Sequence, residues 1–482
     1  MNVIERISHE LTKPVSTAAL VYFRVCFAGL LLIEGVRYWL KGSVHNFWID
    51  PEMHFRYELF EWLPDFSPAI TTALYSLMGV LLICIILGFF FRISSIIFCV
   101  IFSYFFFLDK TPYMNHFYLF VLLSFLMCFL PANKLWSLDV KQGRQKKSSY
   151  VPGWTVWLLR FQLAVVFFYG GIAKLNLDWL RGQPMGVWLS KKGSYPIIGP
   201  YVDEKWLSYF FSYGGLALDL LVVPLLLFKK TRWWALGFAF MFHFMNSKLF
   251  SIGIFPYVMV VLTFLFFQPE SFRQFGEKYF SGFKLPKNPR TKGYEIKTLT
   301  QVLLAGYIVF HLLMPFRHFL YKGDPSWTEE GHFFSWRMML RDKTTSGTLD
   351  IKDVQTGKLL NSIKFTDYLT NSQNNMMLRR PDMIRQFNHY IREVLEEKGS
   401  YGDFEMSSIF LASLNGRDKQ LLIDPEVDLS KQGFNWGTTP WIMPLKTPFV
   451  GPAPAEVLPK TTENKIQELI KQTISQPKAI IK

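Results

Sequence analysis

Apolar runs of about 20 residues alternate with short polar segments over the first two thirds of the chain. A helix needs about 20 mainly apolar residues to cross the bilayer core, and no soluble core requires so many such runs. The pattern therefore predicts a polytopic α-helical membrane domain with about eight or nine transmembrane helices. The predicted spans are 17–40, 68–90, 92–108, 115–131, 154–175, 206–228, 232–250, 252–267 and 299–320.

The pattern changes after Pro315, where shorter polar and apolar segments alternate. Residues 347–365 alternate around turn signals, which predicts a β-hairpin. Residues 379–398 have the periodicity of an amphipathic helix, and 407–427 predict one or two more strands. The expected fold is therefore a polytopic α-helical membrane domain followed by a soluble α+β, mostly β, exoplasmic domain. The predicted boundaries are 1–322 for the membrane domain, 323–450 for the soluble domain and 451–482 for a tail with a short helix near 461–475.

The charged loops alternate between two faces of the predicted bundle. One face receives the N-terminus and the basic residues around Arg92, 141–147, 229–232 and 273–297, while the acidic first loop, 50–65, lies on the other. The excess of cytoplasmic Lys and Arg in membrane proteins predicts a cytoplasmic N-terminus and a periplasmic or lumenal C-terminal domain. The net charge of +15 then points to anionic lipid rather than nucleic acid.

The stretch 157–179, WLLRFQLAVVFFYGGIAKLNLDW, begins as an apolar span and places Lys174 at its far end, after Gly170 and Gly171. An ionisable group at that depth is costly and suggests a function. The alternative is that Lys174 snorkels, with its stem along lipid and its ammonium among the headgroups. A lone lysine would favour the alternative, but other polar residues are predicted on the same side.

The predicted topology gathers these polar residues at the exoplasmic boundary, from four different spans. Each has an ordinary explanation alone: His243 as a core histidine bonded to a carbonyl, His116 as a cap, and Asp109 as part of a solvated turn. Their convergence instead suggests a reactive site, because buried groups shift each other's pKa. The cluster comprises Asp109, Lys110, Asn115, His116, Lys174, Asn176, Asp178, His243 and Asn246, with Arg24 and Asp219 deeper, as a structural ion pair or backbone ligands.

Other site classes lack their residue patterns. The four cysteines, Cys26, Cys84, Cys99 and Cys128, all lie in predicted spans without metal-ligand spacing, so we expect neither a zinc site nor a disulfide framework. No Ser/His/Asp arrangement or glycine-rich phosphate loop occurs. A lysine that loses its proton through desolvation can act as a general base. The sequence therefore favours proton abstraction from a lipid-soluble substrate, without a metal.

Five segments carry a resemblance to a known family. FFYGGIAKLNLDW (167–179), FLDKTPYMNHFYL (107–119) and FHFMNSKLFSIGIF (242–255) resemble hallmark membrane segments of the vitamin K-dependent gamma-carboxylases, whose membrane part is the horizontally transferred transmembrane (HTTM) domain. The segments 321–340 and 421–429 resemble the soluble part of that family. The resemblance runs from the first span to about Leu445. The chain has no N-x-S/T acceptor, which favours a bacterial member.

The resemblance implies an enzyme of the peptidyl-glutamate 4-carboxylase type, a carbon–carbon lyase. Its cofactor would be vitamin K hydroquinone, as reduced menaquinone or phylloquinone, with oxygen and carbon dioxide as co-substrates. A base lysine deprotonates the quinol, and epoxidation produces a strong base. That base removes a glutamate γ-proton, and carbon dioxide adds to the carbanion. The expected partners are the lipid bilayer, the quinol and a Glu-containing peptide or protein, with no nucleic acid.

The matched positions imply the roles of individual residues. Lys174 occupies the position of the base and His116 that of the histidine supporting the reactive intermediate, so both are expected to be catalytic. Substrate binding is expected from Asn115, His243, Asn246, Asp109 and Lys110, and no residue is expected to bind a metal. The chain departs from animal members by having one lysine where they have a pair, no evident cysteine pair and a shorter length.

Three alternatives remain open at the level of sequence. The protein could epoxidise a quinol without carboxylating a peptide, or it could be a non-catalytic quinone-binding membrane scaffold. A scaffold would not need Lys174, His116 and His243 together at costly depth. A transporter would predict internal repeats and helices broken near the midplane, and the sequence contains no evident repeat.

Overall fold

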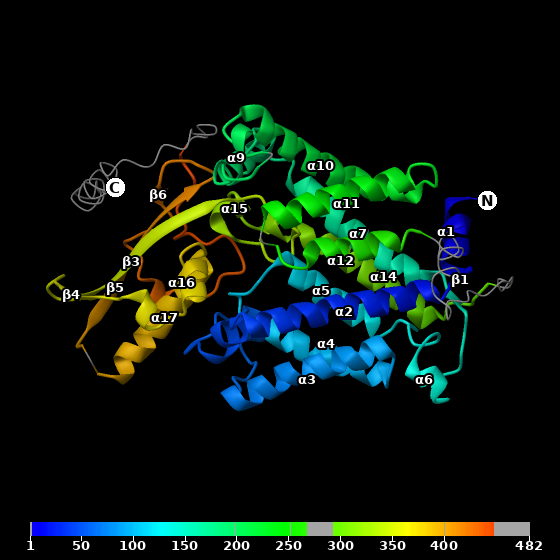
Figure 1. The fold of residues 1–482 in the computed structure, drawn as a ribbon. Helices are drawn as coiled ribbons and strands as arrows, with labels where there is room; N and C mark the ends of the chain where they lie inside the picture. Colours follow the sequence, from blue (N-terminus) through cyan, green and yellow to red (C-terminus); the bar gives the residue numbers. More distant parts are fainter. Residues whose placement is uncertain (1, 197, 251, 268–292, 400, 448–482) are drawn as a thin grey trace.

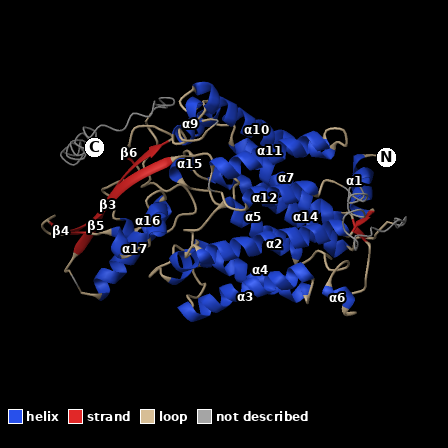
Figure 2. Ribbon diagram, in the orientation of Figure 1, coloured by secondary structure: helices blue, strands red, loops and turns tan. Residues whose placement is uncertain are grey.

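A computed structural model describes the chain except residues 1, 197, 251, 268–292, 400 and 448–482 (Figure 1). The predicted tail with its short helix, and most of the basic segment 273–297, lie outside the described residues. Long helices form one body, and strands with further helices form another at one end of it. Figure 2 shows that the long strands are confined to that end. The predicted fold class is confirmed.

Each predicted span contains a helix. Six helices, counting α14 with the 3-10 turn that continues it, are long and apolar enough to cross a membrane within the described residues, and α5 and α12 are shorter apolar helices. The bundle helices are α2 (Ala18–Leu40), α3 (Pro68–Leu87), α4 (Phe91–Leu108), α5 (Asn115–Met127), α7 (Trp154–Ala173), α10 (Lys205–Leu227), α11 (Arg232–Leu249), α12 (Phe255–Phe264) and α14 (Thr298–Leu313), followed by η5 (Met314–Leu320).

The N-terminal end of the bundle is fastened by short elements far from the soluble domain. The amphipathic helix α1 (Val3–Thr12) precedes β1 (Pro14–Ser16), which pairs antiparallel with β2 (Tyr150–Pro152). Arg24 is buried and donates to the carbonyls of Ala132 and Trp136, each at 2.7 Å. Arg24 is therefore a backbone ligand, one of the two roles expected for it. The N-terminus and the soluble domain lie at opposite ends of the bundle (Figure 1).

The soluble domain contains a four-stranded sheet in the order β4-β3-β5-β6. The strands are β3 (Lys343–Asp353), β4 (Leu359–Ser362), β5 (Phe404–Leu414) and β6 (Gln420–Leu421), and the helices are α15 (Pro325–Thr328), α16 (Asn371–Met377) and α17 (Pro381–Glu397). The predicted hairpin, amphipathic helix and later strands are all confirmed. Its core packs the apolar face of α17, including Phe387, against Leu349, Ile351 and Phe410 of the sheet.

The short elements between the helices hold the two bodies together. Asp178, in the turn α8 (Leu177–Leu180), accepts two bonds from the guanidinium of Arg417, at 2.6 and 2.7 Å, and one from Asn415. The helix α9 (Met185–Ser190) follows, and Trp188 donates to Asp342 just before β3.

The remaining short elements are η1 (His45–Ile49), η2 (Glu58–Phe60), α6 (Leu138–Lys141), η3 (Gly199–Tyr201), η6 (Phe365–Asp367) and η7 (Leu429–Lys431).

Candidate functional site

A cavity of about 460 Å³ lies where the helix bundle meets the soluble domain. Its membrane wall comes from α5, α7, α10, α11 and α12, and its soluble wall comes from residues 332–343 and 376–380. Five of the residues expected at the site line it together: Asn115, His116, Lys174, His243 and Asn246. These come from three helices far apart in sequence, so the fold brings them to one place.

Lys174 ends α7 and is 5% exposed. Its Nζ lies 2.7 Å from Asp219 Oδ2 of α10 and 3.2 Å from the Gly170 carbonyl. The ammonium therefore faces a buried carboxylate rather than lipid headgroups, which excludes snorkelling. Asp219 was expected outside the cluster, but it lines the cavity as the partner of Lys174.

The glycine pair before Lys174 allows this contact. The helix α7 continues through Gly170 and Gly171 without a break. A Cβ at Gly171 would lie 2.6 Å from the Leu220 side chain, and one at Gly170 would lie 3.3 Å from Asp219 Oδ2. Side chains at these two positions would push α10 away, so the glycines set the spacing that joins Lys174 to Asp219.

His243 is a buried histidine whose ring nitrogens lack partners. It is 3% exposed, and neither Nδ1 nor Nε2 has a hydrogen-bond partner among the described residues. Its neighbours are aromatic, with ring centroids of Phe167 and Phe255 at 6.0 and 6.5 Å. The expected alternative, a core histidine bonded to a carbonyl, does not hold for the described residues. A buried imidazole without partners is costly and is suited to a polar group that enters the cavity.

His116 and Asn115 begin α5 and also line the cavity. His116 is 8% exposed, and its ring lies against Phe120 and Phe255, with centroids 5.7 and 5.6 Å away. Asn115 accepts from the Tyr113 hydroxyl at 3.2 Å and donates to the Arg337 carbonyl at 3.4 Å. The start of α5 is thus connected to the soluble domain, while His116 faces the cavity from an aromatic setting.

Asp109 and Lys110, expected to bind substrate, do not line this cavity. Asp109 is fully buried and accepts from His54 Nδ1 at 2.9 Å. Lys110 is 1% exposed and lies between Glu58 and Asp382, at 2.8 and 2.9 Å. Their bonds join the first loop of the bundle to the soluble domain. The solvated turn considered as an alternative is not observed either.

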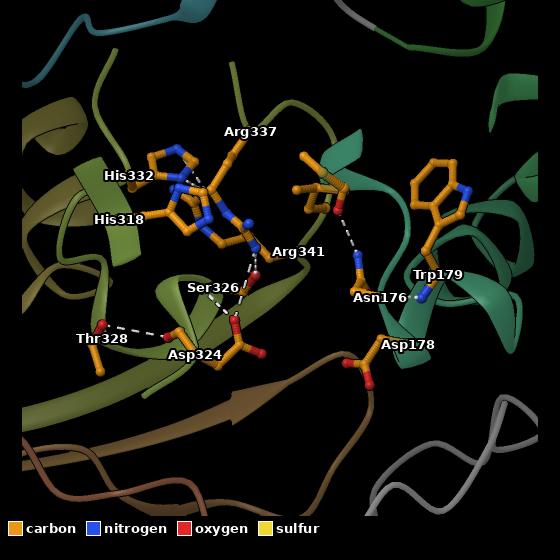
Figure 3. Close-up of polar contacts among 12 residues, drawn as sticks. Asn176, Asp178, Trp179, His318, Asp324, Ser326, Thr328, His332, Arg337 and Arg341 are labelled. Atoms are coloured by element: carbon orange, nitrogen blue, oxygen red, sulfur yellow. Dashed lines mark hydrogen bonds and ion pairs between the residues drawn. The ribbon is translucent and has the colours of Figure 1, made fainter. Parts of the chain in front are cut away.

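Asn176 and Asp178 also stand beside the cavity rather than in its lining. Asn176 accepts from the Trp179 amide at 3.0 Å and donates to the Ala173 carbonyl at 2.8 Å, so it fixes the turn after Lys174 (Figure 3). The Trp179 ring lies under the Lys174 ammonium, at 5.2 Å from its centroid. Asn176 therefore acts on the site through the backbone that carries Lys174 and Trp179.

The soluble domain gives the cavity a cationic wall that sequence reasoning missed. The segment Arg337–Lys343 and the turn between α16 and α17 bring five basic side chains to the lining, whereas Asp219 is the one lining carboxylate among the described residues. Figure 3 shows Arg337 and Arg341 close to His332. The available signal was the density of basic residues in RMMLRDK and LRR. The wall consists of Arg337, Arg341, Lys343, Arg379 and Arg380.

One buried carboxylate behind this wall neutralises part of it. Glu329 contacts Arg341 Nη2 at 2.7 Å and Lys343 Nζ at 3.5 Å. Burial, with the nearby charge of Arg341, still lowers the pKa of Lys343 to about 8. Burial and the same guanidinium hold the pKa of His332 well below its usual range. His332 is therefore neutral at pH 7, and the wall retains an excess of positive charge.

Arg380 is the least compensated cation of the wall. It is 3% exposed, and its Nε and Nη1 have no hydrogen-bond partner within the described part of the chain. Its guanidinium instead packs on the ring of Phe333, 4.4 Å from the centroid. A buried guanidinium with unsatisfied donors favours a carboxylate or another planar anion in front of it.

The cavity thus joins an amine–carboxylate pair and two histidines in apolar surroundings to a cationic wall. Groups of three or more His, Cys, Asp or Glu side chains arranged to hold a metal ion are absent from the described residues. The arrangement suits proton transfer with a neutral, mainly apolar molecule on one side, and binding of an anion on the other.

Two family models match the chain over successive regions. The HTTM domain matches residues 12–270, and the lumenal domain of vitamin K-dependent gamma-carboxylase matches residues 296–448. The two matches meet at the cavity, since Lys174 and His243 lie in the first and the cationic wall lies in the second. No solved structure matches the chain.

Proposed function

Because the chain belongs to the vitamin K-dependent gamma-carboxylase family, we propose that it uses the energy of quinol epoxidation to carboxylate glutamate. The observation that carries the proposal is that the Lys174–Asp219 pair and the cationic wall line the same cavity. One wall suits a quinol from the bilayer and the other suits a carboxylate. Both reactants of the family's chemistry can thus meet in one space.

Lys174 is proposed to take the proton from a quinol hydroxyl. An ammonium cannot accept a proton, so Lys174 must first release one, and Asp219 at 2.7 Å is placed to receive it. Transfer of that proton would leave a neutral amine beside a neutral carboxylic acid, without a net buried charge. Asp219 also fixes the direction of the lysine stem, so we assign it as a positioning residue.

The two histidines are proposed to bind the oxygens of the quinol. His243 has both ring nitrogens free of protein partners in the described structure, and one of them carries a proton in either tautomer. His116 faces the same space from α5. Phe167 and Phe255 also line the cavity and supply apolar surface for the ring of the quinol. When bound, the deprotonated quinol would be oxidised by oxygen to vitamin K epoxide, and this oxidation would supply the strong base that the second half of the reaction needs.

The cationic wall is proposed to hold the glutamate. Its γ-carboxylate would face Arg380 and its neighbours, which would neutralise the negative charge that grows when the adjacent γ-carbon gives its proton to the strong base produced by epoxidation. That carbon then forms a bond to carbon dioxide, and the product carries one more carboxylate than the substrate. A wall whose five cations outnumber the carboxylates paired with them, Glu329 and Asp324, suits this increase in negative charge.

The reaction is tested with purified protein, chemically reduced vitamin K, oxygen and ¹⁴C-bicarbonate. We expect quinol epoxide in every sample with quinol and oxygen, and fixed radiolabel only when a Glu-containing peptide is present. Epoxide without fixed radiolabel would support an epoxidase that does not carboxylate. Binding of quinone without epoxide would support a non-catalytic scaffold and would overturn the proposal.

The orientation in the membrane is part of the proposal. The basic loops that the structure describes, around Arg92, 141–147 and 229–232, lie at the end of the bundle opposite the soluble domain, and the charge bias of membrane proteins supports a cytoplasmic N-terminus. Lys146 and Lys358 are both exposed, so each can be replaced by cysteine. In a variant without the four native cysteines, Lys358→Cys should react with an impermeant maleimide on intact cells and Lys146→Cys should not. The reverse labelling would contradict this orientation.

A further inference from the structure

The strand β3 has one open edge that leads into the cavity. β5 pairs with it along its whole length, from Lys343 to Asp353. β4 pairs on the other side only with residues 350–352, and the last bond on that side runs from the Ile363 amide to the Leu349 carbonyl. The chain after Ile363 leaves the edge, and Phe365 stacks on Phe410 of the core. Residues 343–348 therefore have no neighbouring strand on that side in the described structure.

The register shows which backbone groups this edge presents. Backbone groups of successive strand residues point alternately to the two sides. Leu349 bonds toward β4 through its carbonyl, so Gly347 and Thr345, two and four residues earlier, point the same way. The opposite strand agrees, because the partner of Gly347 is Phe410, whose carbonyl bonds to β6 rather than to β3. Within the described chain no group bonds to the amides or carbonyls of Thr345 and Gly347.

The side chains of this edge do not protect it. Open strand edges in soluble domains usually carry prolines or exposed lysines, which discourage pairing with other chains. Here residues 344–348 read TTSGT, with no proline or charge, and Thr345 and Gly347 are partly exposed. The one lysine of the segment, Lys343, is 4% exposed and belongs to the cationic wall. The edge is thus neutral and open, and it ends at the cations.

We propose that an extended, glutamate-containing polypeptide adds to the sheet as a strand beside Thr345 and Gly347, and that its chain enters the cavity at Lys343. Such strand addition draws affinity from backbone bonds, which depend little on sequence, and specificity from the pockets its side chains reach. Here the cationic wall is that pocket, and it selects a carboxylate. The inference rests on the proposed function for the fate of the glutamate, but peptide binding at the edge stands independently of turnover.

The geometry also predicts which glutamate of the peptide reaches the cationic wall. A strand advances about 3.3 Å per residue, and its side chains alternate between two faces. Pairing beside Thr345 and Gly347 fixes the register, so the glutamate that reaches the wall is the one a few residues along from the paired stretch. Glutamates one residue out of phase would point to the other face.

A single substitution can remove the edge donor without breaking the sheet. Thr345→Pro deletes the outward amide, and proline is tolerated at a strand edge whose amide faces outward. Thr345→Val keeps that amide and the β-branched shape, so it is the matched control. The probe is a fluorescein-labelled nine-residue peptide of alternating valine and threonine with one central glutamate. Its anisotropy with purified protein in detergent gives the dissociation constant without any reaction.

We expect Thr345→Pro to raise that dissociation constant about three- to tenfold, as loss of one hydrogen bond does, with Thr345→Val near wild type. Epoxidation of free quinol should be the same in both variants, which also reports that they are folded. An unchanged dissociation constant for Thr345→Pro would overturn strand addition. A change in oligomeric state of Thr345→Pro would overturn it too, because a second copy of the chain would then occupy the edge.

A second measurement uses the unaltered protein. Peptides N-methylated at one backbone position at a time should lose affinity at every second position along the paired stretch. Loss at consecutive positions, or at none, would overturn strand addition whatever the variants show. If wild-type protein forms no epoxide and fixes no carbon dioxide but this alternation is present, the function proposed above fails and the peptide site remains.

Discussion

The two walls of the cavity differ in their balance of positive and negative charge. On the membrane side Lys174 has a carboxylate at 2.7 Å, and His243 lies among aromatic rings without a hydrogen-bond partner in the part of the chain that the structure describes. On the soluble side Glu329 pairs with Arg341 and Lys343, Asp324 lies 3.9 Å from Arg337, and two donors of Arg380 lack a hydrogen-bond partner among the described residues. The first wall is close to neutral, and the second carries an excess of positive charge.

The difference in charge leads us to expect a different ligand at each wall. A neutral wall in apolar surroundings suits a neutral molecule from the bilayer, because no charge has to be desolvated when it enters. A wall with uncompensated cations remains costly until an anion arrives, and binding of a carboxylate relieves that cost. The proposed function therefore assigns the quinol to the membrane domain and the glutamate to the soluble domain, and each wall can be tested separately.

Replacement of Lys174 should have the largest effect. Loss of a positioned general base costs about 10²–10⁴-fold in rate, so Lys174→Ala should lose epoxidation by that factor. Lys174→Arg should fail nearly as badly, since arginine is not deprotonated in proteins. The rate of epoxide formation from free quinol measures both, and Lys205→Ala, at an exposed lysine on α10, is the control. Near-normal epoxidation by Lys174→Arg would contradict the assignment.

Asp219→Ala should have the next largest effect, measured as stability. Removing one partner of a buried ion pair costs about 3–5 kcal/mol, whereas an apolar replacement of both is often neutral. We therefore expect a lower melting temperature in detergent for Asp219→Ala and recovery in Lys174→Met/Asp219→Leu, although the double variant should remain inactive. A melting temperature of Asp219→Ala equal to that of wild type would show that Lys174 needs no counter-charge.

The membrane wall was largely predictable from sequence, and the reason is its cost. Lys174, His116 and His243 stand out because polar residues are rare in apolar runs. The same rule should have selected Asp219, in GGLALDLL, as the partner of Lys174. Sequence showed both residues at depth but not their pairing, because pairing depends on how α7 packs on α10 through Gly170 and Gly171.

The soluble wall was not predictable in the same way. Arg337, Arg341 and Arg380 occur in a polar domain, where basic residues are common and carry no signal of their own. Their role follows from burial and from facing the cavity, which only the fold supplies. Asp109 and Lys110 show the converse: they were expected at the site, but their partners, His54 and Asp382, come from distant segments and place them in a structural contact.

Arg380→Met should weaken peptide use without affecting the quinol reaction. A hydrogen bond to a charged group contributes about 1.5–3 kcal/mol, so the KM for a Glu-containing peptide should rise about 10- to 100-fold. The melting temperature should change little, because Arg380 has no ion-pair partner in the described structure that would be left buried without its counter-charge. Arg385→Met is the control, as this buried guanidinium does not line the cavity and donates to the Gln432 carbonyl. An equal loss of epoxidation and peptide use in Arg380→Met would contradict the division between the walls.

The smallest effect concerns the pH dependence of peptide binding. Burial, and the charge of Arg341, lower the pKa of Lys343 to about 8. Lys343 is therefore charged at pH 7 and loses its charge as the pH rises through 8, so one of the five cations disappears. We expect the peptide dissociation constant to rise about two- to fivefold between pH 7 and 9, by the loss of one partly screened attraction.

Lys343→Arg separates this cause from others, because arginine keeps its charge over that range. The dissociation constant of this variant for the peptide should not change with pH, whereas that of the wild type should rise between pH 7 and 9.

The same rise in pH has the opposite effect on the stability of the fold. The pKa of Lys343 is about 8 in the folded protein and near 10.5 when the lysine is exposed. Between these two pH values the unfolded chain therefore binds more protons than the folded chain. For this reason Lys343 makes folding more favourable as the pH rises from 8 to 10.5. Weaker peptide binding at pH 9 together with undiminished stability would therefore identify Lys343, whereas a parallel fall of both in wild type and Lys343→Arg would assign the change to general unfolding.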